Sequence, residues 1–186
     1  MHMLRVILFT HVAAAIGLFI ALAIDWVVLA RLRRAVSFEQ AREWAGLWTL
    51  LAPIGVPSFL VILVSGVYLA KTFGLWRVDW TSVAVPTLVV VAIAGAVVRP
   101  RRKRLLSAIS ANSGPLPPQL LAELRQPLLV QSLRLRAALL VGLVFVMTVK
   151  PDRGGVLAIL AAASLGTLWG RATRRDPARA EVGSLD

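Results

Sequence analysis

Long apolar segments alternate with short basic connections along this chain of 186 residues. Five apolar segments stand out, at residues 6–30, 50–70, 78–98, 133–149 and 155–169. Because a helix needs about 20 apolar residues to cross a bilayer, the pattern predicts an all-α membrane protein, a polytopic helical bundle of five transmembrane helices. Residues 155–169 are short for a crossing, so an alternative with 133–149 and 155–169 as a re-entrant pair stays open.

The two ends of the chain differ in character. Residues 6–30 form an apolar run longer than the roughly 7–15 residues of a signal peptide. We therefore expect an uncleaved first span, although residues 21–23 resemble a cleavage site. Residues 172–186 are polar, so we expect a single bundle over 1–171 and then a short, disordered cytoplasmic tail.

The first connection and the segment after it carry their own helix signals. Residues 37–40 (SFEQ) match a capping box, in which the Ser37 hydroxyl accepts from the Gln40 N–H, so a helix is expected to begin there. Pro53 and Pro57 are expected to kink the start of the second span. This break is interpreted either as a simple kink or as the wall of a cavity.

The third connection is the longest. We expect the third span to continue through RPRRKR (99–104) beyond the bilayer and to end at residues 113–114. After a rigid turn at residues 115–118, the stretch 119–136 predicts an amphipathic helix that runs into the fourth span with a kink near Pro127.

Composition supports a membrane protein. The chain is 58% hydrophobic and 16% charged, with a mean hydropathy of +0.78, whereas soluble domains are about 45–50% apolar. The net charge is +12, but the charges cluster at the ends of apolar segments, without the basic, aromatic-interleaved groove typical of nucleic-acid binding. We therefore expect the lipid bilayer, and not nucleic acid, as the partner.

Lysine and arginine are distributed unevenly between the two sides of the predicted bundle. Sixteen of the 21 lie in the first connection, the third connection or the C-terminal tail. The positive-inside rule places these segments in the cytoplasm. The N-terminus is then expected outside and the C-terminus in the cytoplasm.

A basic cluster follows the third apolar segment and consists of Arg99, Arg101, Arg102, Lys103 and Arg104. Each such residue near an anionic surface contributes on the order of 1 kcal/mol of attraction. We therefore expect a lipid-facing anchor that contacts anionic lipids at the cytoplasmic face. A specific lipid or partner site is the alternative.

Small residues recur at every fourth position in the first and fifth segments, at Ala13, Gly17 and Ala21 and at Ala162, Gly166 and Gly170. Such spacing lets helix backbones approach closely in lipid. Both helices are therefore expected to pack inside the bundle, in a homodimer interface or against another membrane protein.

Two ionisable residues, His11 and Asp25, interrupt the first apolar segment. They share one helix face and lie about 21 Å apart along the axis. Since such residues usually face the bundle interior, Asp25 is expected to form an interfacial ion pair with Arg31, Arg33 and Arg34. His11 is expected either to hydrogen-bond a neighbouring helix or to serve as a haem or metal ligand or a proton carrier.

Cofactor chemistry is limited by the residue types present. The chain has no cysteine, which excludes disulfides, thiolate metal sites and cysteine nucleophiles. A tetrahedral or dinuclear metal site lacks ligands, which leaves haem b on His11. His2 and His11 lie about 13.5 Å apart on one helix, so they cannot both ligate one iron within one subunit. Water, Met147 and Lys71 stay open as the second ligand.

Residues 4–98 resemble a bacterial membrane superfamily that includes copper-resistance CopD-like proteins, HemJ-type protoporphyrinogen oxidases and predicted integral membrane proteins of unknown function. The likeness rests on an early histidine before a small-residue stretch (HVAAAIGLFIALA), on PSFLVILVSGVYLA in the second span, and on FGLWRVDW in the outer loop. It implies a multi-pass protein of the bacterial cytoplasmic (inner) membrane. HemJ-type enzymes have a lysine after the loop tryptophan, where this chain has TSVAVPT after Trp80, so it is most similar to the uncharacterised members.

Two functional hypotheses follow. The first is a non-enzymatic accessory or transport-related bundle, because the sequence shows no Ser-His-Asp set, no carboxylate pair within a span and no nucleotide-binding loop. The second is a haem-binding or redox membrane protein that uses His11. Neither hypothesis assigns a catalytic residue.

Overall fold

The structure is a computed structural model, which describes residues 2–75 and 79–150 and the single positions 154, 157, 161 and 165. Over these residues the chain forms helices joined by short connections, which confirms the predicted all-α class. The elements in chain order are α1 (His2–Leu32), α2 (Phe38–Ala45), the 3-10 helix η1 (Gly46–Leu50), α3 (Leu51–Thr72), α4 (Asp79–Ala111), α5 (Pro118–Leu124) and α6 (Pro127–Val149).

Within the described residues, four helical stretches are long and apolar enough to cross a membrane. They are His2–Leu32, Phe38–Thr72, Thr81–Ala111 and Pro118–Val149. Their length and composition agree with the predicted membrane protein. The predicted fifth segment, 155–169, lies outside the described residues apart from three positions, as do Ala162, Gly166, Gly170 and the tail. The five-span count therefore stays a prediction.

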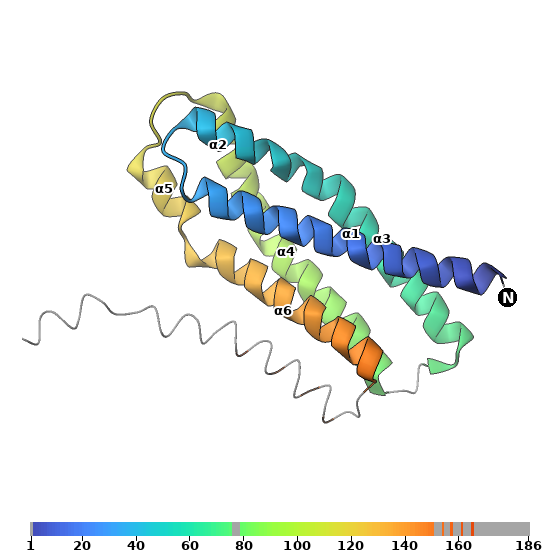
Figure 1. Cartoon of the computed structure of the whole chain (residues 1–186). Helices are drawn as coiled ribbons and strands as arrows, with labels where there is room; N and C mark the ends of the chain where they lie inside the picture. The colour runs from blue at the N-terminus through green and yellow to red at the C-terminus, as the bar shows by residue number, and fades with distance from the viewer. Residues whose placement is uncertain are drawn as a thin grey trace, which may run out of the picture.

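The long helices form two antiparallel pairs, α1 with α3 and α4 with α6 (Figure 1). Contacts between the pairs are fewer than contacts within them. The N-terminus and the connection from α3 to α4 lie at one end of the bundle, and α2 and α5 lie at the other. Both basic connections are therefore at the same end, here called the α2–α5 end.

Close backbone approach holds α1 against α3. A Cβ placed on Gly17 would overlap the Ser58 hydroxyl, and a Cβ on Gly55 would lie 3.4 Å from the Cβ of Ala21. In lipid, where apolar burial does not drive helix association, such contacts supply the packing energy. Of the three small residues predicted to pack here, Gly17 and Ala21 face α3, whereas Ala13 is exposed.

Backbone hydrogen bonds join the first and third connections at the α2–α5 end. The Phe38 N–H donates to the Gly114 carbonyl at 2.9 Å, and the Leu116 N–H donates to the Val36 carbonyl at 3.1 Å. Gly114 makes the turn possible because its φ of +91° lies in the left-handed region. Fully buried side chains pack beneath this turn: Val28, Leu32, Val98, Leu105, Ile109 and Leu124.

The structure confirms one of the predicted helix signals and corrects another. The Ser37 side chain accepts from the Gln40 N–H, as the capping box predicts, although Gln40 Oε1 accepts from the N–H of Val36. The predicted continuous helix with a kink near Pro127 is wrong. Instead, α5 ends at Leu124 and Pro127 begins α6, because a proline fits the first turn of a new helix and lacks the N–H to continue an old one.

Candidate functional site

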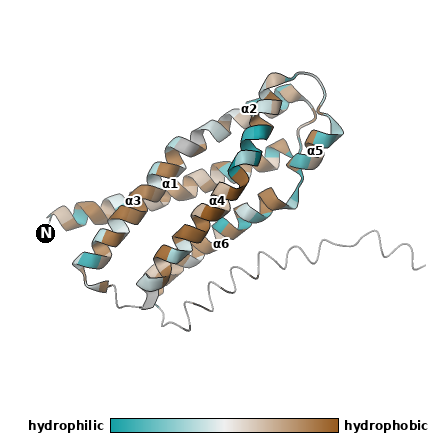
Figure 2. Cartoon of the chain, turned by 180° about the vertical axis from the view of Figure 1, so that it is seen from behind, coloured by the Kyte–Doolittle hydropathy of each residue, from teal (hydrophilic) through white to brown (hydrophobic). Residues whose placement is uncertain are grey.

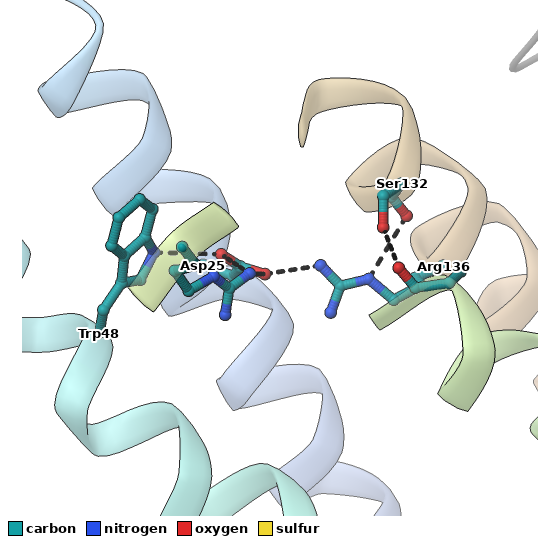
Figure 3. Close-up of polar contacts among 6 residues, drawn as sticks. Asp25, Trp48, Ser132 and Arg136 are labelled. Atoms are coloured by element: carbon teal, nitrogen blue, oxygen red, sulfur yellow. Dashed lines mark hydrogen bonds and ion pairs between the residues drawn. The ribbon is translucent and has the colours of Figure 1, made fainter. Parts of the chain in front are cut away.

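The Asp25 carboxylate is the centre of a buried polar cluster. Asp25 is 3% exposed. Arg102 Nη2 donates to both of its oxygens, at 2.8 and 2.6 Å, and Arg136 Nη2 donates to Oδ2 at 2.6 Å. The Trp48 indole Nε1–H donates to Oδ1 at 3.2 Å, from the side opposite Arg136 (Figure 3). Each carboxylate oxygen thus accepts two hydrogen bonds, which meets the capacity of the group.

Four separate elements supply these side chains. Asp25 comes from α1, Trp48 from η1, Arg102 from α4 and Arg136 from α6. Asp25 precedes the end of α1 by seven residues, so the cluster lies about 10 Å inside the α2–α5 end. The cluster therefore connects the α1–α3 pair with the α4–α6 pair through charged side chains.

Arg136 is positioned by its neighbours on α4 and α6. Its Nε donates to the Ser132 carbonyl at 3.3 Å, and the Ser132 hydroxyl donates to the Ala94 carbonyl at 2.5 Å. The Arg136 side chain passes Gly95, where an added Cβ would lie 3.7 Å from Nη1. The lack of a side chain at Gly95 therefore leaves space beside the guanidinium.

The charges of the cluster do not cancel. One carboxylate faces two guanidiniums, and buried charges are costly unless they are paired. Arg102 also stacks over the Trp48 ring, with Cζ 5.2 Å from the ring centroid, which is within cation–π range. In the part of the chain that the structure describes, Arg102 Nε is buried without a hydrogen-bond partner.

A cavity of about 400 Å³ adjoins this cluster. Its polar wall contains Asp25, Trp48, Arg99, Arg102, Lys103 and Arg136. The remaining wall is largely apolar and comes from α1, α3, α4 and α6, including Leu18, Phe59 and Leu140. Four cationic side chains therefore share the cavity with one carboxylate.

The exposed residues of the cavity wall show where it opens. Val56 on α3 and Ala92, Ala96, Arg99 and Lys103 on α4 line the cavity and are exposed. The lining residues of α1 and α6 are buried or half-buried. Thr49 of η1 also lines the cavity and is exposed, so the opening runs along the side of the bundle, between η1 and α3 on one side and α4 on the other.

Comparison of the chain with protein-family models, curated proteins and solved structures finds no match. The resemblance to CopD-like and HemJ-type proteins therefore stays a prediction.

The structure gives Asp25 other ion-pair partners than the sequence predicted. Asp25 does not pair with the arginines that follow it on α1, because its partners come from α4 and α6. Arg31 instead stacks over the Trp44 ring, with Cζ 4.9 Å from the centroid. The prediction of a local ion pair at Asp25 is therefore wrong.

The predicted lipid-facing cluster divides between two environments. Arg102 turns inward to Asp25 and is not lipid-facing, because the buried carboxylate offers it a counter-charge. Arg99 and Lys103 are exposed and line the cavity. Arg101 is half-buried and Arg104 is exposed, and neither lines the cavity. The basic end of α4 is visible as its hydrophilic part near α2 (Figure 2).

His11 lies in the interface between α1 and α3, away from the cavity. Its Nδ1 is 2.9 Å from Ser65 Oγ, and the Ser65 hydroxyl donates to the Val61 carbonyl. Gly66 gives the ring room, since a Cβ there would lie 3.2 Å from His11 Cε1. Among residues 2–75 and 79–150, no group of three or more His, Cys, Asp or Glu side chains is placed to hold a metal ion.

Sequence reasoning missed Trp48, Ser132 and Arg136 as parts of the site. Arg136 had a usable signal, because an arginine next to the apolar run of residues 137–149 is costly in lipid and usually faces the protein interior. Trp48 and Ser132 had none, since tryptophan is common at membrane interfaces and serine is common in membrane helices.

Proposed function

We propose that this protein is a non-enzymatic membrane component, accessory or transport-related, which binds an anionic ligand in the cavity beside Asp25. The observation that carries the proposal is the charge of the wall. Arg99, Arg102, Lys103 and Arg136 line the cavity, and Asp25 is the one carboxylate among its lining residues.

The excess positive charge favours an anion. Asp25 already engages Arg102 and Arg136, and the cationic groups of Arg99 and Lys103 remain unbalanced by it. Positive charge near the membrane interior is costly without a counter-ion. An anionic group in the cavity would lower this cost, and guanidinium and ammonium donors match its acceptor oxygens.

The state of Asp25 supports binding rather than catalysis. A general base must be within hydrogen-bond reach of the proton that it accepts. Both Asp25 oxygens are already occupied by Arg102, Arg136 and Trp48. The carboxylate therefore acts as a structural counter-charge for the arginines, and the cavity offers donors to a ligand.

The proposed topology has five spans, with the N-terminus outside and the C-terminus in the cytoplasm of a bacterial cell. The position of both basic connections at the α2–α5 end supports this orientation, because basic segments stay in the cytoplasm. The cavity would then open into the inner leaflet of the cytoplasmic membrane, where anionic lipids are frequent.

Anion titrations of protein purified in dodecyl maltoside test the binding function. Isothermal titration with dodecyl phosphate, dodecanoate and inorganic phosphate should show saturable binding of at least one probe. The double variant Arg99→Gln/Lys103→Gln should weaken it about tenfold or more, because a charged hydrogen bond contributes about 1.5–3 kcal/mol. The probe should be recovered chemically unchanged.

The matched control is Arg101→Gln/Arg104→Gln, which removes two charges from the same run of α4 but none from the cavity wall. It should leave affinity within about twofold, since neither guanidinium lines the cavity. If no anionic probe binds, or if both double variants weaken binding equally, the proposed site is wrong.

Haem binding by His11 is a second candidate. The observation that favours it is the contact between Nδ1 and Ser65, because proteins orient a ligating imidazole through its other ring nitrogen. Protein expressed with haem supplementation should then show a Soret absorption band that His11→Ala removes and His2→Ala retains. A wild-type spectrum without this band would exclude the candidate.

A further inference from the structure

We propose that the ligand of this cavity is an anionic phospholipid, whose phosphate headgroup carries a net negative charge and which enters sideways from the bilayer between α3 and α4. This inference rests on the proposed anion-binding function and specifies its ligand class. It depends on three features of the cavity: the direction of its opening, the separation of polar and apolar wall residues, and the donors that remain for a phosphate.

Part of the opening lies at the height of the apolar stretches. Val56 and Ala92 are exposed wall residues on α3 and α4, at heights along the helices that belong to these stretches. Toward the α2–α5 end, Leu32, Leu105 and Ile109 are buried in the hydrophobic cluster that also contains Trp48 of the cavity wall. A ligand that is already in the membrane therefore has the shortest path to the cavity.

Polar and apolar wall residues are separated along the helix axis. On α4, the wall contains Val91, Ala92 and Gly95 toward the membrane middle, and Arg99, Arg102 and Lys103 toward the α2–α5 end, where Leu106 is the one apolar wall residue beyond them. This order matches a lipid whose headgroup points to the α2–α5 end and whose chain points to the bilayer centre. A small soluble anion would make no contact with the apolar half of the wall.

The donors for a phosphate come from one face of α4. Arg99 and Lys103 are four residues apart, so they are neighbours on the helix surface, and neither is an ion-pair partner of Asp25. Arg102 between them is engaged by Asp25, so the exposed cationic groups of Arg99 and Lys103 are the donors that remain. Phosphate oxygens can accept hydrogen bonds from several such donors at once.

The chain of the lipid would lie against an apolar wall on which small side chains leave space. Leu18, Phe59 and Leu140 line this part, and Ala92 and Ala96 leave space where larger residues would fill it. For a chain that already lies in the bilayer, contact with this wall adds van der Waals packing rather than transfer out of water. Together with the confinement of the lipid to the membrane, this packing should raise the apparent affinity above that of the phosphate group alone.

Paired titrations separate the lipid from a free anion. In dodecyl maltoside, dodecyl phosphate should bind at least about tenfold more tightly than inorganic phosphate, because its chain holds the phosphate in the micelle beside the opening and adds packing contacts with the wall. Dodecyl maltoside has an uncharged headgroup and a chain of equal length, and it is present in excess. Binding of a dodecyl chain without a charged headgroup is therefore already saturated in every titration. Ala92→Phe should weaken dodecyl phosphate about tenfold and leave inorganic phosphate unchanged.

Val90→Phe is the matched control, because Val90 is exposed on α4 but does not line the cavity. It should bind both probes as the wild type does. If Ala92→Phe does not fold, Ala96→Leu narrows the same wall and replaces it in the test.

Native mass spectrometry of protein released from mixed nanodiscs is a second test. The wild type should retain phosphatidylglycerol in preference to phosphatidylcholine, and Arg99→Gln/Lys103→Gln should lose it.

The possible results distinguish the two proposals. Equal affinity for inorganic phosphate and dodecyl phosphate, with the same dependence on Arg99 and Lys103, would overturn the lipid and leave the anion-binding function standing. Equal retention of phosphatidylglycerol and phosphatidylcholine would also overturn the lipid. Absence of binding by every anion would overturn both.

Discussion

Asp25 shows how a single residue in a membrane helix can be stabilised by distant parts of the chain. An isolated carboxylate among apolar side chains would be strongly destabilising. Here Arg102, Arg136 and Trp48 satisfy both of its oxygens. The same contacts hold two guanidiniums beside a cavity. The residue therefore stabilises the fold and maintains the positive charge of the site.

Asp25→Asn is expected to lower the free energy of unfolding by about 3 kcal/mol, because it leaves Arg102 and Arg136 buried without a counter-charge. Equilibrium unfolding in mixed micelles measures the change. Adding Arg136→Met should recover part of the loss by removing one of the uncompensated charges. Glu43→Gln makes the same chemical change at an exposed position and should have little effect. An unchanged Asp25→Asn stability would show that the ion cluster does not stabilise the bundle.

Two glycines allow a test of backbone conformation without change of packing. A Cβ would meet nothing within 4 Å at either Gly114 or Gly46, but Gly114 has a φ of +91° and Gly46 a φ of −56°. Gly114→Ala should therefore cost about 1–2 kcal/mol of unfolding free energy. Gly46→Ala should stabilise by about 0.5–1 kcal/mol. The same sign for both substitutions would contradict the turn geometry of the third connection.

At the scale of elements, small residues and hydroxyls decide how α1 and α3 pack. Gly17 lies against Ser58, Ala21 against Gly55, and His11 bonds to Ser65. In lipid these contacts replace the hydrophobic driving force of a soluble core. His11 therefore has a packing role in this interface whether or not it also binds a cofactor.

Gly17→Ala is expected to destabilise the bundle by about 1–3 kcal/mol, the usual cost of overpacking, because the added methyl overlaps the Ser58 hydroxyl. In a Ser58→Ala background the cost should fall, since the Ser58 Cβ would be 3.5 Å away. Gly55→Ala is the control on the same interface, where the added Cβ makes an ordinary contact of 3.4 Å. Equal costs with and without Ser58→Ala would contradict this contact. Thermal unfolding in detergent measures all four variants.

At the scale of the molecule, two helix pairs are joined at the α2–α5 end and leave a cavity between them. Hydrogen bonds between the first and third connections and the core beneath them hold this end together. Closer to the membrane middle, the Asp25 cluster forms a charged contact between the pairs. The side opening between α3 and α4 is a consequence of the few contacts between these two helices.

The proposed orientation can be tested with single cysteines, because the chain has none of its own. A membrane-impermeant maleimide applied to intact cells should label Phe73→Cys and leave Ser113→Cys unlabelled until the cells are opened. Both positions are exposed. Ser184→Cys should behave like Ser113→Cys if the chain crosses five times and like Phe73→Cys if it crosses four times. Labelling of Ser113→Cys in intact cells would reverse the orientation.

The helices were largely predictable because a bilayer imposes a minimum length and an apolar composition on any helix that crosses it. The predicted segments 6–30, 50–70 and 133–149 lie within α1, within η1 and α3, and within α6, and residues 79–98 of the third segment lie within α4. The break before α6 was predicted as a kink in one continuous helix. A proline is compatible with a kink and with the start of a new helix, and the packing of α5 at the end of the bundle decides between the two.

The sequence by itself determined the long apolar helices and the basic connections between them, because hydropathy and charge act locally along the chain. It also marked Asp25 as a residue that needs a partner. Only the tertiary structure decided which partner, since Arg102 and Arg136 are 77 and 111 residues away along the chain. The cavity likewise exists only where four helices meet. Ion pairs between distant residues and cavities between helices depend on how the helices pack, and one apolar pattern along the chain is compatible with several packings.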